Sequence, residues 1–210
     1  MILKVNTTRV ALLGLKRELK VAEKGHKLLK DKRDGLMKKF LARIRETRAL
    51  RADVEKRLGS AFSSYVRANA MIPEAVLESA MLLPNASVRL DVDVANVMSV
   101  RIPEFRVEKT GNAFSYGFLN TTGDLDNAVR KFDDVFTDII RLAELEKSVE
   151  CLAEEIEKTR RRVSALEHIR IPNLRDTIRY IALQLEERGR DAVVSTMRVK
   201  AMITKKEYTN

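Results

Sequence analysis

Residues Thr7–Phe40 read TTRVALLGLKRELKVAEKGHKLLKDKRDGLMKKF and combine apolar residues at helical spacing with many lysines and arginines. From Leu12 to Arg57, alternating steps of three and four residues meet mostly apolar side chains, which is the 3.5-residue period of a left-handed coiled coil. The positions are Leu12, Leu15, Leu19, Ala22, His26, Leu29, Arg33, Leu36, Phe40, Arg43, Thr47, Leu50, Val54 and Arg57. We therefore expect one helix from about Thr8 to Leu58.

Further apolar residues beside this series predict a wider buried stripe. They are Leu13, Leu28, Met37, Leu41 and Ile44. Three glycines, Gly14, Gly25 and Gly35, each cost a helix about 1 kcal/mol relative to alanine. Either they are simply tolerated, or they allow another protein backbone to approach the helix closely.

A second apolar series with the same spacing predicts a C-terminal helix. Its positions are Leu142, Leu145, Val149, Leu152, Ile156, Thr159, Val163 and Leu166, followed after a change of phase by Ile169, Leu174, Ile178, Ile181 and Leu185. Pro172 removes one backbone hydrogen bond, so we expect a kink near 168–172 at a cost on the order of 3 kcal/mol. The apolar period resumes within a few residues, which favours a kink over an end of the helix.

The middle of the chain follows a different pattern. Pro73 is placed to begin a short helix at about 73–83, which Pro84 would end. Alternation of apolar and charged residues then predicts a β-hairpin at about 88–107, followed by a loop. One strand would half-bury Val88, Leu90, Val92 and Val94. The turn falls either at Ala95-Asn96 or around Pro103-Glu104, and the sequence leaves both open.

The net charge of +10 is unevenly placed along the chain. The first 60 residues hold 18 lysines and arginines against 7 acidic residues, whereas residues 124–160 hold 11 acidic against 6 basic residues. If Ser60 lies near Asp124, the basic and acidic segments run side by side. Such pairs contribute only ~0–1 kcal/mol each, but they select the partner and orientation of a helix.

These patterns predict a mainly α protein in which the N- and C-terminal helices form a long antiparallel two-helix coiled coil. We expect residues 1–60 to form the first helix and residues 124–210 the second. Residues 61–123 would form a small central insert with the short helix, the hairpin and the loop.

Sequence features of enzymes and of membrane-spanning or secreted chains are absent. No apolar run approaches the ~20 residues needed to cross a bilayer, and no phosphate-binding loop appears. His26 and His168 lack metal-ligand spacing, and the single cysteine, Cys151, has acidic neighbours that would not activate a thiolate. We expect no catalytic, cofactor-binding or metal-binding residues, and a cytoplasmic protein.

A basic cluster at Arg160, Arg161 and Arg162 is either a solvated helix face or a surface on which a partner docks. Charge runs are most often solvated, so composition alone favours the first interpretation.

Several segments of the chain resemble the family of D subunits of V-type ATPases. Thr7–Asp34 is similar to the N-terminal signature of that family, Leu142–Pro172 to its second signature, and Asn96–Pro103 to the insert between them. The blocks occur in the family's order and spacing over nearly the whole chain. Two departures are Ser164, where the family usually has Asn, and Ser99, where Gly is common. The second departure affects the expected hairpin turn.

This resemblance implies a non-catalytic central-stalk protein that transmits torque. Family members form one antiparallel coiled coil whose termini enter the hexamer of A and B subunits, while the F subunit contacts its side. The base of the stalk lies on the funnel-shaped C (or d) subunit above the membrane ring. ATP hydrolysis on the A subunits then drives transport of H⁺ or Na⁺, or ATP is made in reverse. The chain would be a single copy, peripheral to the membrane, with no cofactor of its own.

The resemblance also implies a role for the lysines of the first helix. A rotor must contact its sleeve at three angles, and charge contacts at an interface rim are weak and re-formable. We expect Lys16, Lys20, Lys24 and Lys27 to face acidic or polar loops of the hexamer.

Two other classes of protein share some of these features. A prefoldin-like scaffold or chaperone also joins two helices through β-hairpins, but it does not explain the matched signatures. A nucleic-acid-binding coiled coil would suit the isoelectric point of about 9.8, but it needs a basic stretch free of heptad burial or stacking aromatic residues. The first helix has neither, so we expect no nucleic-acid partner.

Overall fold

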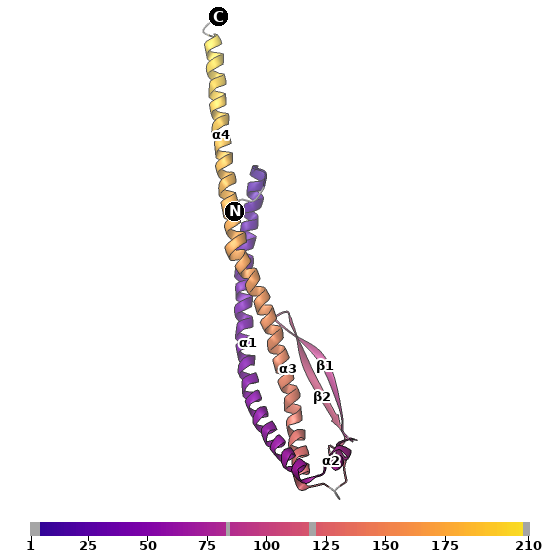
Figure 1. Cartoon of the computed structure of the whole chain (residues 1–210). Coiled ribbons are helices and arrows are strands. Elements are labelled where there is room, and N and C mark those ends of the chain that lie inside the picture. The colour runs from indigo at the N-terminus through magenta and orange to yellow at the C-terminus, as the bar shows by residue number, and fades with distance from the viewer. Residues whose placement is uncertain (1–4, 83–84, 118–120, 208–210) are drawn as a thin grey trace. The chain divides into compact units, whose positions relative to one another are not determined.

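The computed structural model describes residues 5–82, 85–117 and 121–207. The elements, shown in Figure 1, are α1 (Arg9–Met71), α2 (Glu74–Met81), β1 (Ser87–Val97), β2 (Val100–Thr110), α3 (Gly123–Ala165), the π-helical turn η1 (Leu166–Arg170) and α4 (Ile171–Glu207). The predicted fold class is confirmed: long N- and C-terminal helices enclose an insert of one short helix and a β-hairpin. None of the described helices is long and apolar enough to cross a membrane.

The chain forms two compact units. We call Met1–Arg33 together with Lys158–Asn210 the terminal unit, and Asp34–Glu157 the central unit. Helices α1 and α3 each contribute residues to both units. Each unit is described by itself below.

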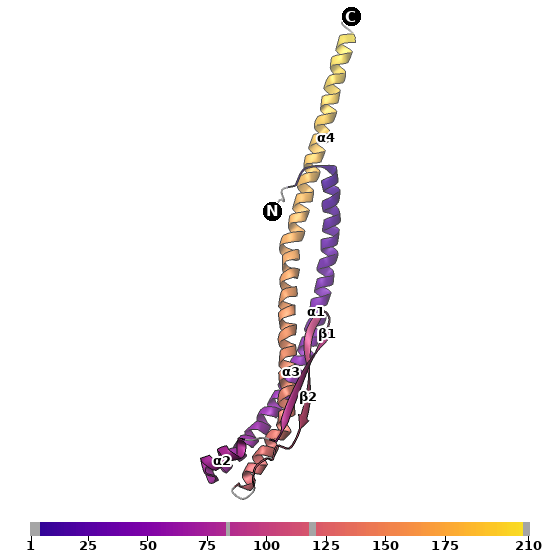
Figure 2. The same ribbon diagram turned by 90° about the vertical axis from the view of Figure 1, so that its right-hand side faces the viewer.

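In the terminal unit, the first part of α1 runs antiparallel to α4, as Figures 1 and 2 show. Leu15 of α1 packs against Leu174 and Ile181 of α4, and all three side chains are buried. Half-buried side chains surround them, namely Leu12, Leu19, Ala22, Ile178 and Leu185. Arg188 Nη1 donates a hydrogen bond of 2.9 Å to the carbonyl oxygen of Thr7, just before α1 begins.

The π-helical turn η1 joins α3 to α4 directly before Pro172. The backbone N–H of Ile171 donates to the carbonyl of Leu166, five residues earlier, where an α-helix would use the residue four earlier. Val163 and Ile171 are both buried and are eight residues apart, one more than the coiled-coil repeat of seven. The π-turn accommodates the extra residue and explains the change of phase in the apolar series. The helical path continues past Pro172, and a kink there remains a prediction.

In the central unit, basic side chains of α1 pair with acidic side chains of α3, in agreement with the charge distribution. Arg51 Nη2 lies 2.5 Å from Glu146 Oε1, and Arg57 Nη2 lies 2.7 Å from Asp138 Oδ2. The higher residue number on α1 pairs with the lower number on α3, so the two helices are antiparallel.

The register expected between these helices is wrong by one heptad. Ser60 lies beside Lys131, whose Nζ donates to Ser60 Oγ at 2.9 Å, and Asp124 pairs instead with Arg67. The cause is that α1 continues well past Leu58, where the coiled-coil pattern predicted its end. The buried side chains of this added stretch are small: Ala61, Ser64 and Ala68. Small side chains let the two helices stay close, so the pair extends two further turns.

The hairpin turn lies at neither predicted position. Strands β1 and β2 pair without a bulge from Ser87–Thr110 to Val97–Val100, and the two-residue turn is Met98-Ser99. Both turn residues have positive φ, 55° and 69°, as a type I′ turn requires. The Ser99 N–H donates to Asn96 Oδ1 at 2.9 Å. Met and Ser are unusual at positive φ, so Ala95-Asn96 and Pro103-Glu104 were the stronger turn signals in the sequence but not the correct ones.

The tip of the hairpin packs on the helix pair of the central unit. Val100 and Ile102 of β2 form a buried cluster with Leu36 of α1 and with Leu152 and Ile156 of α3. This cluster gives the hairpin a fixed place on the helices.

Of the four glycines in α1, which include Gly59, only Gly35 meets a neighbouring side chain. A Cβ atom there would lie 2.8 Å from Met98 Cε, so the glycine makes room for the turn methionine. Around Gly14 and Gly25 there is open space.

The far end of the central unit has its own core, where α2 packs on α1 and α3. The buried residues are Ala68, Ile72, Leu77 and Leu125, with Tyr65, Val76, Tyr116 and Val129 partly buried against them. Pro73 directly precedes α2, as predicted, whereas Pro84 lies outside the described residues. Between β2 and α3, the described residues 111–117 and 121–122 contain no helix or strand, in agreement with the expected loop.

Candidate interaction surfaces

The residues with chemically reactive side chains are dispersed. His26 Nε2 lies 3.5 Å from Glu167 Oε2 across the terminal unit, and His168 is exposed. Cys151 is partly buried against the cluster at the hairpin tip. Among the described residues, no group of three or more His, Cys, Asp or Glu side chains is placed to hold a metal ion. The exposed surfaces of the described residues are the candidate sites at which a partner binds.

The four lysines predicted to contact a partner all lie exposed on the terminal part of α1. Lys16, Lys20, Lys24 and Lys27 are separated by four, four and three residues, so their side chains share one face of the helix. We call this group the lysine face. An exposed cationic face of this kind attracts acidic partners, and the attraction weakens as salt is added.

A second apolar stripe runs along the same stretch of α1 and is exposed. Part of this stripe was predicted from the sequence to be buried. Val10 is 80% exposed, Leu13 58%, Val21 69% and Leu28 69%. Leu13 and Leu28 were expected to widen the buried stripe, as were Met37 and Leu41, which are 38% and 47% exposed. The expectation failed because a helix packed against one partner helix buries only the narrow a/d seam. Ile44 is partly buried.

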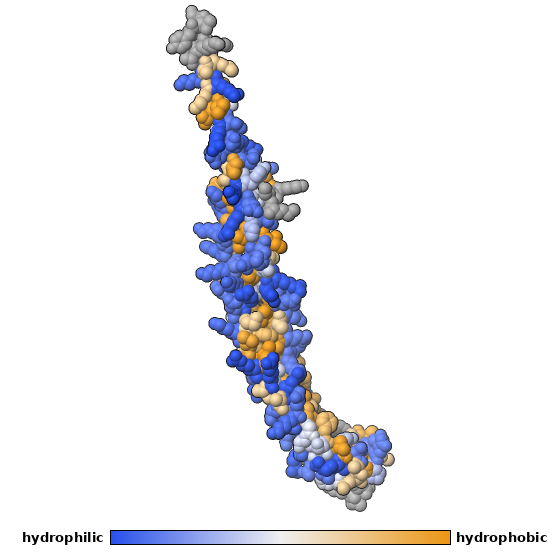
Figure 3. Space-filling view, turned by 60° about the vertical axis from the view of Figure 1, so that its left-hand side comes forward, coloured by the Kyte–Doolittle hydropathy of each residue, from blue (hydrophilic) through white to orange (hydrophobic). Residues whose placement is uncertain are grey.

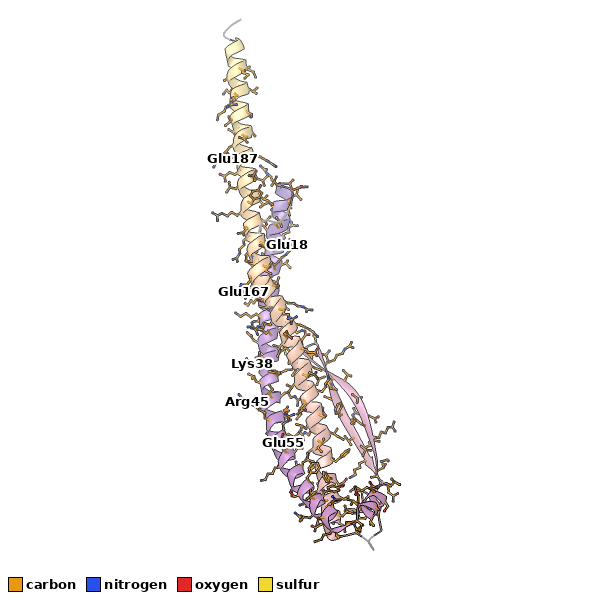
Figure 4. All side chains as sticks on the ribbon, viewed as in Figure 1. Glu18, Lys38, Arg45, Glu55, Glu167 and Glu187 are labelled. Atoms are coloured by element: carbon orange, nitrogen blue, oxygen red, sulfur yellow. The ribbon has the colours of Figure 1, made fainter. Side chains whose placement is uncertain are left out.

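Acidic residues of α1 in the terminal unit pair with arginines of η1 and α4. Glu18 pairs with Arg170, and Glu23 Oε1 lies 2.7 Å from Arg175 Nη2. Glu18 is labelled on α1 in Figure 4. The polarity is opposite to that of the pairs Arg51–Glu146 and Arg57–Asp138 in the central unit, where α1 supplies the base. Since these pairs use the acids of α1, they leave its lysine face to solvent.

The C-terminal stretch of α4 extends past the start of α1. Figure 2 shows this stretch without a second helix beside it, beyond the contact of Arg188 with Thr7. Its exposed apolar side chains are Val193 (54%), Val194 (46%), Met197 (65%), Val199 (55%), Met202 (66%) and Ile203 (54%). In Figure 3 apolar surface alternates with hydrophilic surface along this stretch. Large apolar side chains exposed together on one helix are typical of a surface that another protein covers.

The arginine cluster occupies the last turns of α3 in the terminal unit. Arg160, Arg161 and Arg162 are all exposed, while Thr159 and Val163 on either side of them are buried against the partner helix. The cluster therefore lies on the solvent face of α3, on a different helix from the lysine face.

The end of the central unit carries another exposed apolar group. Phe62 is 54% exposed, Val66 64%, Met71 73% and Leu82 75%. The rings of Phe62 and Phe132 meet edge to face with centroids 5.1 Å apart. A cavity of about 290 Å³ lies nearby, between the base of the hairpin and α3. Its lining residues are Met81, Ala86, Val88, Lys109, Ala113, Val129, Phe132, Asp133 and Phe136.

Two ionisable groups of the central unit, Arg57 and Tyr116, have pKa values that their surroundings raise. The hydrogen bond from Arg57 to Asp138, together with nearby Asp53, raises the pKa of the Arg57 guanidinium. Burial raises the pKa of the Tyr116 hydroxyl well above its usual value, and the 2.8 Å hydrogen bond that it donates to Asp126 Oδ1 adds to the effect. No motif in the sequence points to Tyr116, because its environment depends on how the loop before α3 packs.

Comparison with known proteins identifies close relatives along the whole chain. Residues 11–201 match the family model described as the D subunit of ATP synthase. A protein of Clostridioides difficile (strain 630), described as a V-type ATP synthase D subunit, is 46% identical over 207 residues, which cover 97% of this chain and 93% of that protein. Proteins of the same description from Fusobacterium nucleatum and Clostridium novyi (strain NT) are 45% and 42% identical, and the matches cover 97% and 98% of this chain and 98% and 97% of theirs.

Proposed function

Because the chain belongs to the family of D subunits of V-type ATP synthases, we propose that it is the central-stalk component that rotates within such a complex. In this function it transmits torque between ATP hydrolysis or synthesis in the A/B hexamer and transport of H⁺ or Na⁺ through the membrane ring. It performs no chemistry itself and needs no cofactor. Its location is the cytoplasmic side of the membrane, as a peripheral part of the complex.

The observation that carries this proposal is the free C-terminal stretch of α4. Beyond Arg188 the helix exposes large apolar side chains and has no partner helix within the described chain. Exposure of these large apolar side chains to water is unfavourable. A surrounding protein that covers them removes this unfavourable exposure. The cavity of a ring-shaped hexamer of A and B subunits would supply that cover.

The lysine face supports contact with the same hexamer. Its four ammonium groups are exposed on α1, while the nearby acids of α1 are occupied by Arg170 and Arg175. Contacts between such flexible charges and acidic or polar loops are individually weak. These contacts break and re-form as the rotor turns. The hexamer therefore holds the rotor without locking it at one angle.

Other surfaces suit the remaining partners of a central stalk. The exposed apolar group at the end of the central unit, Phe62, Val66, Met71 and Leu82, fits contact with the funnel-shaped C (or d) subunit. The arginine cluster at 160–162 is a candidate docking surface for a further component such as the F subunit.

The hairpin argues against a prefoldin-like scaffold. In such proteins hairpins assemble copies with one another. Here Val100 and Ile102 at the tip are buried against Leu36, Leu152 and Ile156 of the chain's own helices.

The test is co-elution of the purified chain with a V-type A/B hexamer, with the ATPase rate measured on the same fractions. We expect one copy per hexamer and a changed, sustained rate. The variant in which Lys16, Lys20, Lys24 and Lys27 are all replaced by Gln should bind about tenfold or more weakly at low salt, and the difference should shrink as salt screens the wild-type contacts.

A variant with the same charge change in the central unit provides the control. Lys38, Lys39, Arg45 and Lys56 are exposed on α1, and their replacement by Gln should leave hexamer affinity near that of the wild type. Equal affinity of the wild type and the lysine-face variant at all salt concentrations would reject the proposed contact. Failure of the wild type to associate, with self-assembly in its place, would reject the central-stalk function.

A further inference from the structure

The hairpin has two outer edges, because β1 and β2 pair only with each other. A free edge of a β-strand presents unpaired N–H and C=O groups that can bind another strand, so proteins usually protect such edges. The two edges of this hairpin are protected to very different degrees.

The turn determines which backbone groups point outward. In a hairpin with a two-residue turn, the pair that flanks the turn is hydrogen-bonded, and hydrogen-bonded pairs then alternate with non-hydrogen-bonded pairs. Val97 and Val100 flank the turn Met98-Ser99. Counting back along β1, the residues whose N–H and C=O groups point to the outer edge are Asn96, Val94, Val92, Leu90 and Val88.

Strand β2 confirms this assignment and has a closed outer edge. Phe105 stands opposite Val92, and its N–H donates to Glu144 Oε2 of α3 at 3.2 Å, away from β1. Pro103 has no N–H to offer at the next outward position. Lys109 pairs with Asp133 of α3 near the base of the hairpin. Figure 1 shows β2 on the side of the hairpin that faces α3.

Strand β1 has none of these protections. Over its 11 residues it contains no proline, lysine or glycine, and its pairing with β2 has no bulge. Within the described part of the chain, no hydrogen bond reaches its outer backbone groups. Four of the residues that supply these groups also have apolar, partly exposed side chains: Val88 (44%), Leu90 (45%), Val92 (56%) and Val94 (65%).

We propose that the outer edge of β1 binds an extended segment of another protein by strand addition, which makes a three-stranded sheet. The backbone groups of the outward residues supply the hydrogen bonds, and alternate apolar side chains of the added strand extend the apolar ladder of β1. This function is separate from torque transmission, and it does not depend on the proposed role in the stalk.

The charges of β1 favour a different protein over a second copy of this chain. An antiparallel pair of two β1 strands centred on Val92 places Asp91 directly opposite Asp93 of the other copy. Centring the pair on Asp93 places that carboxylate opposite itself. Centring it on Asp91 does the same for Asp91, although Arg89 then stands opposite Asp93. Like charges directly opposite are destabilising, so the register that pairs all 11 residues, with its two Asp91–Asp93 contacts, and the register centred on Asp93 are disfavoured. A partner strand with Lys or Arg opposite Asp91 has no such penalty.

A synthetic peptide, VRITEFRVEKT, is a defined probe of this edge. It repeats β2, whose sequence already pairs with β1 in continuous register, with threonine in place of the proline so that an N–H is available opposite Val94. Its second arginine would lie opposite Asp91. We expect binding at micromolar to millimolar concentration, measured by NMR, with slower hydrogen exchange at the amides of Leu90 and Val92.

The variant Val92→Pro removes one outward N–H and leaves the ladder with β2 intact, as Pro103 does on the other strand. It should weaken peptide binding about tenfold or more, whereas Val92→Thr, which keeps the N–H and the branched shape, should bind as the wild type does. Slow exchange of the Arg106 amide in both variants verifies that the hairpin is formed. Absence of binding, or equal binding by Val92→Pro, would overturn the proposal. A homodimer that Val92→Pro dissociates would overturn it as well, since the occupant would then be a second copy.

Discussion

The terminal unit buries its apolar residues between two helices alone, whereas the central unit adds a β-hairpin to its helix pair. The charges differ as well. In the terminal unit α1 contributes Glu18 and Glu23 to pairs with arginines, and in the central unit it contributes Arg51 and Arg57 to pairs with acids. In these pairs one helix presents opposite signs to its partner in its two halves, while Glu46 of α1 lies 3.7 Å from Arg141 as an exception in the central unit.

This reversal specifies how the two ends of the chain find each other. Each exposed ion pair contributes only ~0–1 kcal/mol, so the pairs do little for stability. A misaligned pairing, however, would bring the acids of α1 beside those of α3 and its arginines beside those of α4. The repulsion would fall on several pairs at once, and this discriminates against the misaligned pairing.

The largest expected effect tests whether the hairpin prevents the central core from closing around a cavity. Leu36 is fully buried between α3 and the hairpin, and Leu174 is fully buried between two helices only. A truncation costs more where the surroundings cannot collapse into the space. Leu36→Ala should therefore lower the free energy of unfolding of the central unit by about 4–5 kcal/mol, and Leu174→Ala that of the terminal unit by about 2–3 kcal/mol, by native-state hydrogen exchange.

The control for this comparison is Met37→Ala, beside Leu36 but 38% exposed. Its effect should stay near ±0.5 kcal/mol, as for surface substitutions in general. If Leu36→Ala and Leu174→Ala lower the free energy of unfolding by equal amounts, the hairpin covers the helix pair but does not stop it from closing around the cavity.

The next effect concerns the turn that fixes the hairpin. Ser99 has φ of 69°, in the left-handed region where a non-glycine residue costs roughly 1–2 kcal/mol. Ser99→Gly should therefore stabilise the central unit by about 1 kcal/mol and leave the terminal unit unchanged, in urea titrations followed by hydrogen exchange.

The same substitution at Ser87 serves as the opposite control. Ser87 lies in extended β1, where glycine is unfavourable, and its Oγ is 2.7 Å from Thr110 Oγ1. Ser87→Gly should destabilise the central unit. If both variants shift stability in the same direction, turn strain is not what distinguishes Ser99.

How well the sequence predicted each element depended on the range of the interactions that form it. The 3.5-residue spacing identified both long helices, because heptad burial is a local pattern in which Leu15, Leu36, Leu145 and Leu152 take part. The register failed because the end of α1 is set by small residues, Ala61, Ser64 and Ala68, which carry no apolar signal.

The hairpin and the surfaces were harder to predict for the same reason. The turn at Met98-Ser99 is held by contacts with Gly35 and Asn96 rather than by turn residues of its own. The exposure of the lysine face could be predicted from sequence, since exposed charges follow directly from helix geometry, while its contact with a partner stays a prediction. The open edge of β1 was not, because Val92 and its neighbours resemble a half-buried strand until the absence of a third strand is known.

The smallest effect compares one tyrosine from each unit. Tyr116 in the central unit is partly buried and donates to Asp126, and burial raises its pKa above the usual value near 10. Tyr180 in the terminal unit is 43% exposed. A raised pKa in the folded state means that the native protein holds the Tyr116 proton more tightly than the unfolded chain does. The resulting stability is fully present below about pH 10 and is lost progressively as pH rises above it.

Tyr116→Phe should therefore flatten the decline in stability of the central unit between about pH 10 and 11.5, measured as the urea midpoint at each pH. At pH 7 it should cost no more than about 1–2 kcal/mol, the usual effect of losing one hydrogen bond and leaving its acceptor to solvent. Tyr180→Phe is the matched control from the terminal unit and should leave the pH profile unchanged. If Tyr116→Phe keeps the wild-type slope, the alkaline decline arises instead from groups outside this loop, and the packing of Tyr116 against α3 does not hold its proton.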